Sequence, residues 1–242
     1  MEWIDNQINV HSGFNDADYG SNSWQASKLA AFETYLRELP RQTEMLIDIG
    51  CFNGSLSERF RRFAAKVIGI DVHEEALKEA RKKGIETLCF DISGGAPIPI
   101  ADQSADVIIG ADIIEHLIDP RVLMKEARRL LKPDGHLLIS TPNMGYWLSR
   151  LRLLRGLAPM CTNGVAPGFH SDHWIDPSHI HVCLIGEWLA FFKDCGWRVN
   201  EIRGSHLTFG GRRRSLAHAV DRFCDRFLPS LSLIPVISLS PT

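Results

Sequence analysis

Short apolar runs alternate along the chain with longer stretches in which apolar residues recur every three or four positions. The short runs predict strands, and the recurring positions predict amphipathic helices. Strands are predicted at Met45–Ile49, Val67–Ile70, Glu86–Phe90, Asp106–Ile109 and His136–Ser140. Helices are predicted over Trp24–Leu39, Leu56–Phe63, His73–Lys83 and Pro120–Leu131. The sequence Pro133-Asp134-Gly135, which follows the last of these helices, predicts a turn.

A helix separates most neighbouring strands, which favours a parallel sheet because parallel strands need crossover connections. The runs Val67–Ile70 and Val107–Gly110 are apolar at successive positions, as expected for strands covered on both faces. The predicted fold class is therefore α/β, with a doubly wound, Rossmann-like sheet and helices on both of its faces.

The domain organisation is predicted as an N-terminal arm and helix over residues 1–43, followed by one α/β domain over residues 44–242. Residues 144–180 contain Pro, Gly and three His and are predicted to form an inserted cap. Later elements are predicted as a helix at Glu187–Cys195, a strand at Trp197–Ile202, a helix with an apolar stripe (Leu216, Ala219, Val220, Phe223, Phe227) and a last strand within Leu231–Leu239.

Composition and charge exclude several classes of protein. The 242 residues hold 27 Lys and Arg against 29 Asp and Glu, so a nucleic-acid binder acting through a basic surface is not expected. The six cysteines are scattered without a Cys-x-x-Cys pair, which indicates a reduced cytoplasmic compartment. The longest uncharged stretch, Phe227–Thr242, is shorter than the about 20 residues of a spanning helix. We expect a soluble protein with no transmembrane segment.

The sharpest motif follows the first predicted strand and reads Leu46-Ile-Asp-Ile-Gly50-Cys-Phe-Asn-Gly54. Glycines at such a turn let the backbone approach a ligand closely. Asp71 closes the next strand, where a carboxylate can accept hydrogen bonds from ribose hydroxyls. Asp91 ends the third strand at the same predicted sheet edge. Each Asp alone is also an ordinary turn former, but three acids at successive strands favour a nucleotide-like ligand.

The type of ligand follows from what the motif contains. A dinucleotide fingerprint has a third glycine that this loop lacks, and the chain has no phosphate loop of the Gly-x-x-x-x-Gly-Lys type. Asp48, before the first glycine, suits a cation better than a pyrophosphate. S-adenosylmethionine combines a ribose with sulfonium and ammonium groups, and is the ligand that we predict.

The ordered motifs resemble those of the class I S-adenosylmethionine-dependent methyltransferases over about residues 44–200. They are Asp48-Ile-Gly50-Cys51, Val-Ile-Gly-Ile-Asp71, Phe-Asp91, Ala111-Asp-Ile-Ile-Glu115-His116-Leu117 and Leu-Lys-Pro-Asp-Gly-His-Leu-Leu-Ile-Ser-Thr-Pro-Asn143. In that superfamily the glycines hold the methionine part, the acid of the second strand the ribose, and the acid after the third the adenine amino group. The residues expected at the cofactor are thus Asp48, Gly50, Cys51, Gly54, Asp71, Val72, Asp91, Ile92 and Ala111. One departure is Phe52, where the family usually has a glycine.

A finer resemblance, to the MetW-like branch, rests on Thr141-Pro142-Asn143, Trp147, the Arg150–Arg155 stretch, Pro159 and His181-Val-Cys-Leu184. The superfamily resemblance implies transfer of a methyl group to a small-molecule acceptor, with oxygen as the atom that we expect. The MetW-like resemblance leaves a second hypothesis open, namely a non-catalytic partner of a biosynthetic enzyme that keeps the cofactor pocket.

The acceptor side is predicted in the cap, where His170, His173, His179 and His181 lie close in sequence to Asp172, Trp174 and Asp176. Such a cluster serves as metal ligands, as a general base with a carboxylate partner, or as ordinary polar surface. We expect no metal and take His179 and His181 as the candidate bases. His116 is expected to be structural or to lie beneath the cofactor.

Two further groups have open roles. Trp147, Phe169 and Trp174 either line an apolar acceptor pocket or pack the cap against the domain. Arg212-Arg213-Arg214, Arg222 and Arg226 flank the apolar stripe of a predicted helix. They form a solvated face, an anchor for an anionic acceptor, or a peripheral contact with a membrane surface.

Overall fold

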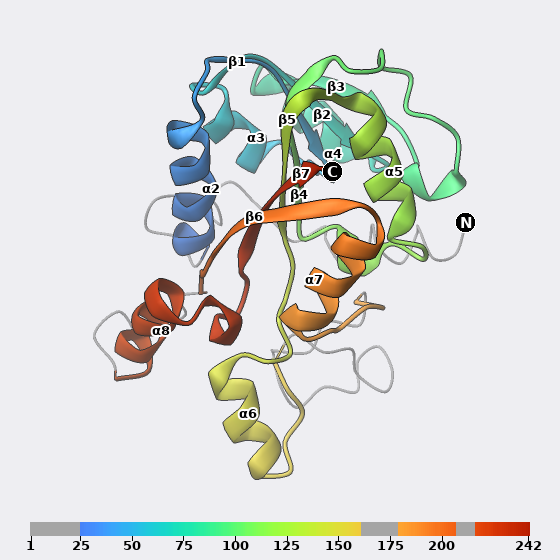
Figure 1. The fold of residues 1–242 in the computed structure, drawn as a ribbon. Helices are drawn as coiled ribbons and strands as arrows, with labels where there is room; N and C mark the ends of the chain where they lie inside the picture. Colours follow the sequence, from blue (N-terminus) through green and yellow to red (C-terminus); the bar gives the residue numbers. More distant parts are fainter. Residues whose placement is uncertain (1–24, 161–178, 207–215) are drawn as a thin grey trace.

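The computed structural model describes residues 25–160, 179–206 and 216–242. Its centre is a seven-stranded sheet in the order β3-β2-β1-β4-β5-β7-β6 (Figure 1). The strands are β1 (Thr43–Ile49), β2 (Ala64–Asp71), β3 (Glu86–Cys89), β4 (Ala105–Ala111), β5 (Leu131–Ser140), β6 (Trp197–Arg203) and β7 (Val236–Pro241).

The first five strands pair in parallel, and β7 runs antiparallel to both β5 and β6. The predicted doubly wound sheet is therefore confirmed. The strand order reverses between β1 and β4, and such a reversal opens a crevice at the carboxyl ends of the strands.

Helices cover both faces of the sheet, because neighbouring residues of each strand point to opposite sides. Leu46 of β1 joins a cluster with α2, α3 and α4, whereas Ile47 joins one with α5 and α7. The helices are α2 (Ala26–Glu38), α3 (Ser55–Phe60), α4 (Glu74–Lys82), α5 (Arg121–Leu130), α6 (Trp147–Leu154), α7 (Ile185–Asp194) and α8 (Leu216–Phe227), with short 3-10 turns η2 (Ile92–Gly94), η3 (Ile114–His116) and η5 (Pro229–Leu231).

The start of β5 differs from the predicted helix and turn. Leu131 pairs with Ala105 and His136 with Val107, so residues 132–135 stand opposite the single residue Asp106. The Asp106 carboxylate accepts hydrogen bonds from the Lys132 ammonium and from the backbone of β1. These bonds hold the predicted turn as an irregularity within the strand.

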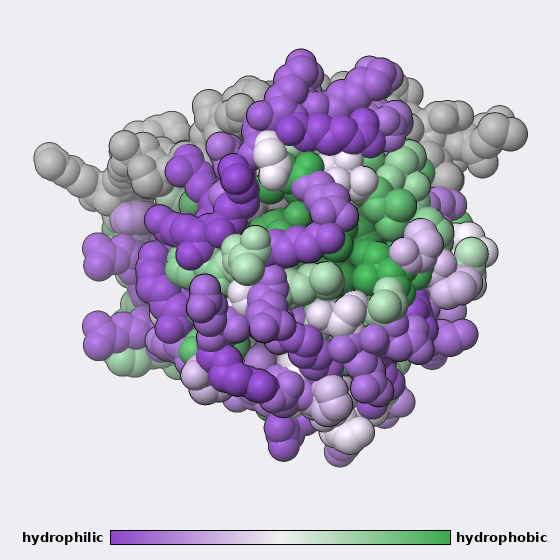
Figure 2. Space-filling model, turned by 90° about the horizontal axis from the view of Figure 1, so that it is seen from above, coloured by the Kyte–Doolittle hydropathy of each residue, from purple (hydrophilic) through white to green (hydrophobic). Residues whose placement is uncertain are grey.

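The two ends of the sheet differ in what covers them. Figure 2 looks down on the end where β1 begins, where polar residues surround a smaller apolar area. The carboxyl ends of the parallel strands point the other way, towards α6 and α8 (Figure 1). Of the predicted cap, residues 144–160 include α6, and residues 161–178 lie outside the described residues. No helix in the described part of the chain is long and apolar enough to cross a membrane.

Candidate functional site

The loop between β1 and α3 turns on positive backbone angles. Gly50 has φ of 81° and Gly54 has φ of 72°, a region that residues with a Cβ rarely adopt. A Cβ on Gly54 would also lie 2.7 Å from the Cβ of Ala80 in α4. The amides of Gly50 and Cys51 both donate to the carbonyl of Ile70, which fixes the loop at the end of β2. The predicted glycine turn therefore lies at the carboxyl edge of the sheet.

Asp71 anchors this loop, a role that the sequence did not indicate. Its carboxylate accepts hydrogen bonds from the backbone amides of Phe52, at 2.8 Å, and His73, at 2.9 Å. Burial raises the pKa of Asp71 despite these bonds. Phe52 itself has φ of 47°, which explains why glycine suits this position, and its ring lies edge-on to that of His73.

Asp48 is a buried acid with an incomplete set of partners. Its exposed fraction is 1%, and one carboxylate oxygen accepts a hydrogen bond from the Ser57 hydroxyl at 2.5 Å. Its other oxygen, Oδ1, has no hydrogen-bond partner within the described residues. Burial raises the pKa of Asp48 to about 7, and the nearby Asp71 charge adds to the effect. A cationic group would stabilise the ionised form of this carboxylate.

Asp112 lies just after β4 and pairs with a lysine from the N-terminal helix. The buried Lys28 ammonium forms an ion pair with the Asp112 carboxylate, which also accepts a hydrogen bond from the Ser140 hydroxyl. Burial alone would raise the pKa of Asp112, but the Lys28 charge and these two bonds outweigh it and lower the pKa. Asp112 has φ of 52°, a second strained non-glycine residue at this edge.

Glu115 is fully buried in η3, and within the described residues neither of its carboxylate oxygens accepts a hydrogen bond of good geometry, although the nearby Thr141 hydroxyl acts to lower its pKa. Burial and the neighbouring Asp112 charge raise its pKa well above the usual range. The Lys28 charge acts on three of the acids at this edge, since it lowers the pKa of Asp48, Asp112 and Glu115. One buried ammonium against the buried carboxyls of Asp48 and Glu115 and the half-buried Asp112 leaves a site suited to a cationic ligand.

Two histidines surround Glu115. The Nε2 atoms of His116 and His179 each lie 4.0 Å from Glu115 Oε1, and their ring centroids are 4.8 Å apart. The amides of Ile180 and His181 donate to the Glu115 carbonyl, which fixes this segment against η3. Glu115, His116 and His179 offer ligand atoms within 4.8 Å of one another, a donor set that could also hold a metal ion.

His181 is the second candidate base, and it lies at the rim. It is partly exposed, and its Nε2 lies 3.4 Å from the carbonyl of Ile118. The structure thus brings His179, rather than His181, next to a buried carboxyl. The other members of the predicted cap cluster, including His170 and His173, lie outside the described residues.

The remaining predicted cofactor residues lie at or just after the carboxyl ends of their strands. Asp91 caps η2 by accepting a hydrogen bond from the Ser93 amide at 2.8 Å, and Ile92 beside it is buried. Val72 directly follows β2, and Ala111 is the last residue of β4. The sequence reasoning missed Lys28 and Asp112. The sequence offered one signal for Lys28, because this lysine lies beside the apolar residues of the helix face that is predicted to be buried.

Comparison with known proteins finds similarity to methyltransferases. Residues 47–139 match a family model described as a methyltransferase domain. The chain is 31% identical over 166 residues to a ubiquinone biosynthesis O-methyltransferase of Caulobacter vibrioides, covering 66% of this chain and 64% of the relative. It is 36% identical over 102 residues to the protein of that description from Idiomarina loihiensis, covering 40% and 42%. The matches thus span less than two thirds of these relatives.

Solved structures share the fold at low sequence identity. A SAM-dependent methyltransferase from Aquifex aeolicus superimposes with a TM-score of 0.58 at 16% identity, covering 93% of this chain and 98% of that one. An S-adenosylmethionine-dependent methyltransferase from Mesorhizobium loti gives 0.56 at 18% identity, covering 86% and 97%. These similarities concern the fold.

Proposed function

Because this chain belongs to the class I S-adenosylmethionine-dependent methyltransferases, with its methyltransferase domain at residues 47–139, we propose that it transfers a methyl group from S-adenosylmethionine to a small-molecule acceptor. Oxygen is the proposed methylated atom, since the similar proteins from Caulobacter and Idiomarina are named O-methyltransferases. The observation that carries the proposal is the cluster of buried acids, incompletely compensated, beside a glycine-bearing loop at the carboxyl edge of the sheet.

The residues at this edge fit S-adenosylmethionine. The loop from Gly50 to Gly54 would hold its methionine part, and Asp71 would accept hydrogen bonds from the ribose hydroxyls. Each Asp71 oxygen accepts one backbone hydrogen bond and keeps a second lone pair for the ligand. Asp48 and Glu115 would compensate the positive charges of the ligand. The bound cofactor supplies a methyl group that its sulfonium has already activated.

His179 is our proposed general base for the acceptor hydroxyl, with His181 as the second candidate. The Glu115 carboxyl next to His179 would stabilise the imidazolium that forms when the ring takes the proton. The chain's further contribution would be to align the acceptor with the methyl group and to exclude water. The non-catalytic alternative, based on the MetW-like resemblance, is less favoured because the relatives described above carry the names of enzymes.

We place this activity in the cytoplasm. Cys51, Cys89, Cys183, Cys195 and Cys224 are free thiols, as is usual in a reducing compartment.

Ligand-dependent melting tests the proposal. S-adenosylmethionine and its demethylated product should raise the melting temperature, because a ligand present at a hundredfold excess over its Kd stabilises the native state by about 2.7 kcal/mol. NAD and ATP are the controls and should leave it unchanged. Transfer of a labelled methyl group to a panel of hydroxyl-bearing acceptors then tests catalysis. Equal shifts with NAD would contradict the assignment.

A further inference from the structure

The apolar stripe of α8 faces outward instead of into the core. Leu216, Ala219, Phe223 and Phe227 follow one another at intervals of three and four residues, and all of them are exposed. Leu216 is 82% exposed and Phe227 59%. Scattered apolar residues are normal on a protein surface, but an exposed stripe at helical spacing indicates a surface that something covers.

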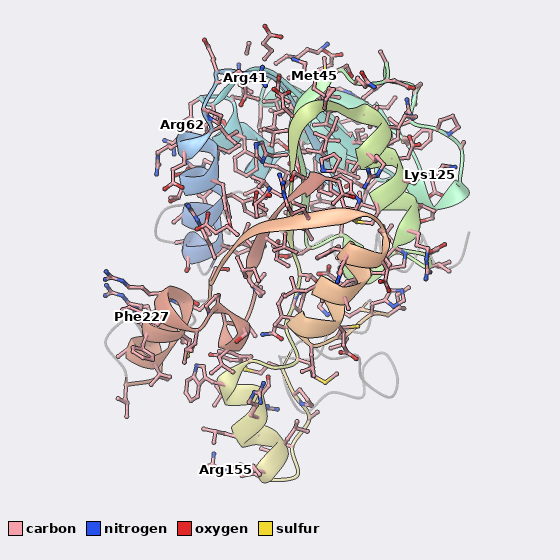
Figure 3. The ribbon with its side chains drawn as sticks, in the orientation of Figure 1. Arg41, Met45, Arg62, Lys125, Arg155 and Phe227 are labelled. Carbon is pink, nitrogen blue, oxygen red and sulfur yellow. The ribbon has the colours of Figure 1, made fainter. Side chains whose placement is uncertain are left out.

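Helix α6 shows the same feature at the same end of the molecule. Leu151, Leu153 and Leu154 of α6 and Leu157 after it are exposed, and Leu154 reaches 83%. Figure 3 shows Arg155 at the far tip of α6 and Phe227 on α8, both at the end towards which the parallel strands point. We call these exposed faces of α6 and α8 the α6–α8 surface.

A buried carboxylate holds the two helices together. Asp221 of α8 accepts hydrogen bonds from the Tyr146 hydroxyl at 2.6 Å and from the Trp147 indole at 2.8 Å, at the start of α6. The exposed apolar residues are therefore carried by two helices that are fixed to each other, not by two independent segments.

The charges of the α6–α8 surface have one sign. Helix α6 contains arginines and no acidic residue, and the two acids of α8 are turned inward. Asp221 takes the bonds just described, and Asp225 pairs with His206 and Ser27. Arg155, Arg222 and Arg226 are exposed and form no ion pair within the described residues.

We propose that the α6–α8 surface binds the face of an anionic lipid bilayer. Leucine and phenylalanine side chains would enter the boundary between headgroups and acyl chains, while the arginines contact acidic headgroups. Exposed Leu and Phe with arginine neighbours are the composition of helices that lie on anionic membranes. The carboxyl edge of the sheet would then face the bilayer, from which an apolar acceptor could be taken. The binding surface itself does not depend on the proposed methyl transfer.

Vesicle flotation of the full chain tests this proposal. The protein should float with vesicles of phosphatidylcholine and phosphatidylglycerol, much less with phosphatidylcholine alone, and less in high salt. Replacing Arg155 and Arg222 together by Ala should lower the partition coefficient by about 25-fold, at about fivefold per basic residue near the surface. Phe223→Asp should also lower it strongly. Lys125→Glu, an exposed basic residue on α5 (Figure 3), is the control and should change it little.

Calorimetry with S-adenosylmethionine separates this test from that of the proposed function, because none of the variants touches the loop or the buried acids. Variants that bind the cofactor normally and float less support the proposal even if no methyl acceptor is found. Flotation of the Arg155/Arg222 and Phe223 variants equal to that of the parent would overturn it. A dimer in the ultracentrifuge that Phe223→Asp converts to a monomer would also overturn it, by assigning the surface to a second copy of the chain.

Discussion

Replacing Asp48 by Asn should stabilise the protein without ligand and weaken its binding of S-adenosylmethionine. The carboxyl is 1% exposed, and its pKa lies at about 7 instead of 3.8 because burial penalises the charged form. At 1.36 kcal/mol for each pKa unit, keeping this group ionised in the native state costs about 4 kcal/mol. Asn retains an oxygen for the Ser57 hydroxyl and removes the charge.

The effect has a defined pH dependence. Below pH 3.8 Asp48 is protonated in both the unfolded and the native state, and the ionisation penalty is absent. Between pH 3.8 and about 7 the unfolded state releases the proton first, so the stability of the parent falls as the pH rises. The advantage of Asp48→Asn should therefore grow across this window to a maximum of about 4 kcal/mol above pH 7.

Urea unfolding at pH 4.5, 6 and 8 measures this difference, and calorimetry measures the affinity. Loss of a hydrogen bond to a charged group corresponds to about 1.5–3 kcal/mol, so Asp48→Asn should bind S-adenosylmethionine about ten- to hundredfold more weakly. The exposed Asp194→Asn is the matched control and should change neither quantity. Equal stability of Asp48→Asn and the parent at pH 8 would refute the buried-charge reasoning, and unchanged affinity would refute its role toward the ligand.

Three other substitutions test the same edge of the sheet. Asp71→Ala should weaken cofactor binding by about 10²–10⁴, with Asp71→Asn in between, and calorimetry showing parental affinity would contradict the ribose assignment. His179→Gln should lower turnover by about 10²–10⁴ with cofactor affinity intact. If a chelator of divalent metals lowers the turnover of the parent protein by the same factor, the cluster of Glu115, His116 and His179 holds a metal ion instead of acting as a base. Lys28→Met should lower the free energy of unfolding by about 3–5 kcal/mol, because it leaves the half-buried Asp112 charge without its ion-pair partner. Its control is Lys66→Met, from an exposed ion pair, which should cost less than about 1 kcal/mol.

The sheet and the cofactor loop could be predicted because local patterns determine them. The apolar run ending at Ile49, the glycine turn after it and Asp71 at the next strand end are neighbours in sequence, and the parallel topology brings them to one edge. The same logic placed Asp91 and Ala111 correctly at the ends of their strands.

The Lys28–Asp112 ion pair could not be predicted from local patterns. Its two residues are 84 positions apart, and they meet because α2 packs across the sheet with its lysine towards the carboxyl ends. Likewise, a histidine-rich segment indicates reactive chemistry, but only the bonds from its backbone to Glu115 select His179 as the one beside a buried carboxyl. The stripe of α8 predicted the helix correctly, yet its spacing alone does not tell whether the stripe faces the core or the solvent.

Two of the three non-glycine residues with positive φ in the described part of the chain, and two buried acids without a full set of partners, lie at the carboxyl edge of the sheet. Phe52 and Asp112 have positive φ there, at about 1–2 kcal/mol each, and Asp48 and Glu115 are buried acids with raised pKa values. Such costs persist only where the rest of the fold supports them, here through the apolar clusters on both faces of the sheet. A cationic ligand at this edge would compensate the buried acids, so the ligand-bound protein should gain more stability above pH 7 than below pH 5. Equal ligand-induced shifts in melting temperature at both pH values, with the ligand saturating, would mean that these acids do not face the ligand.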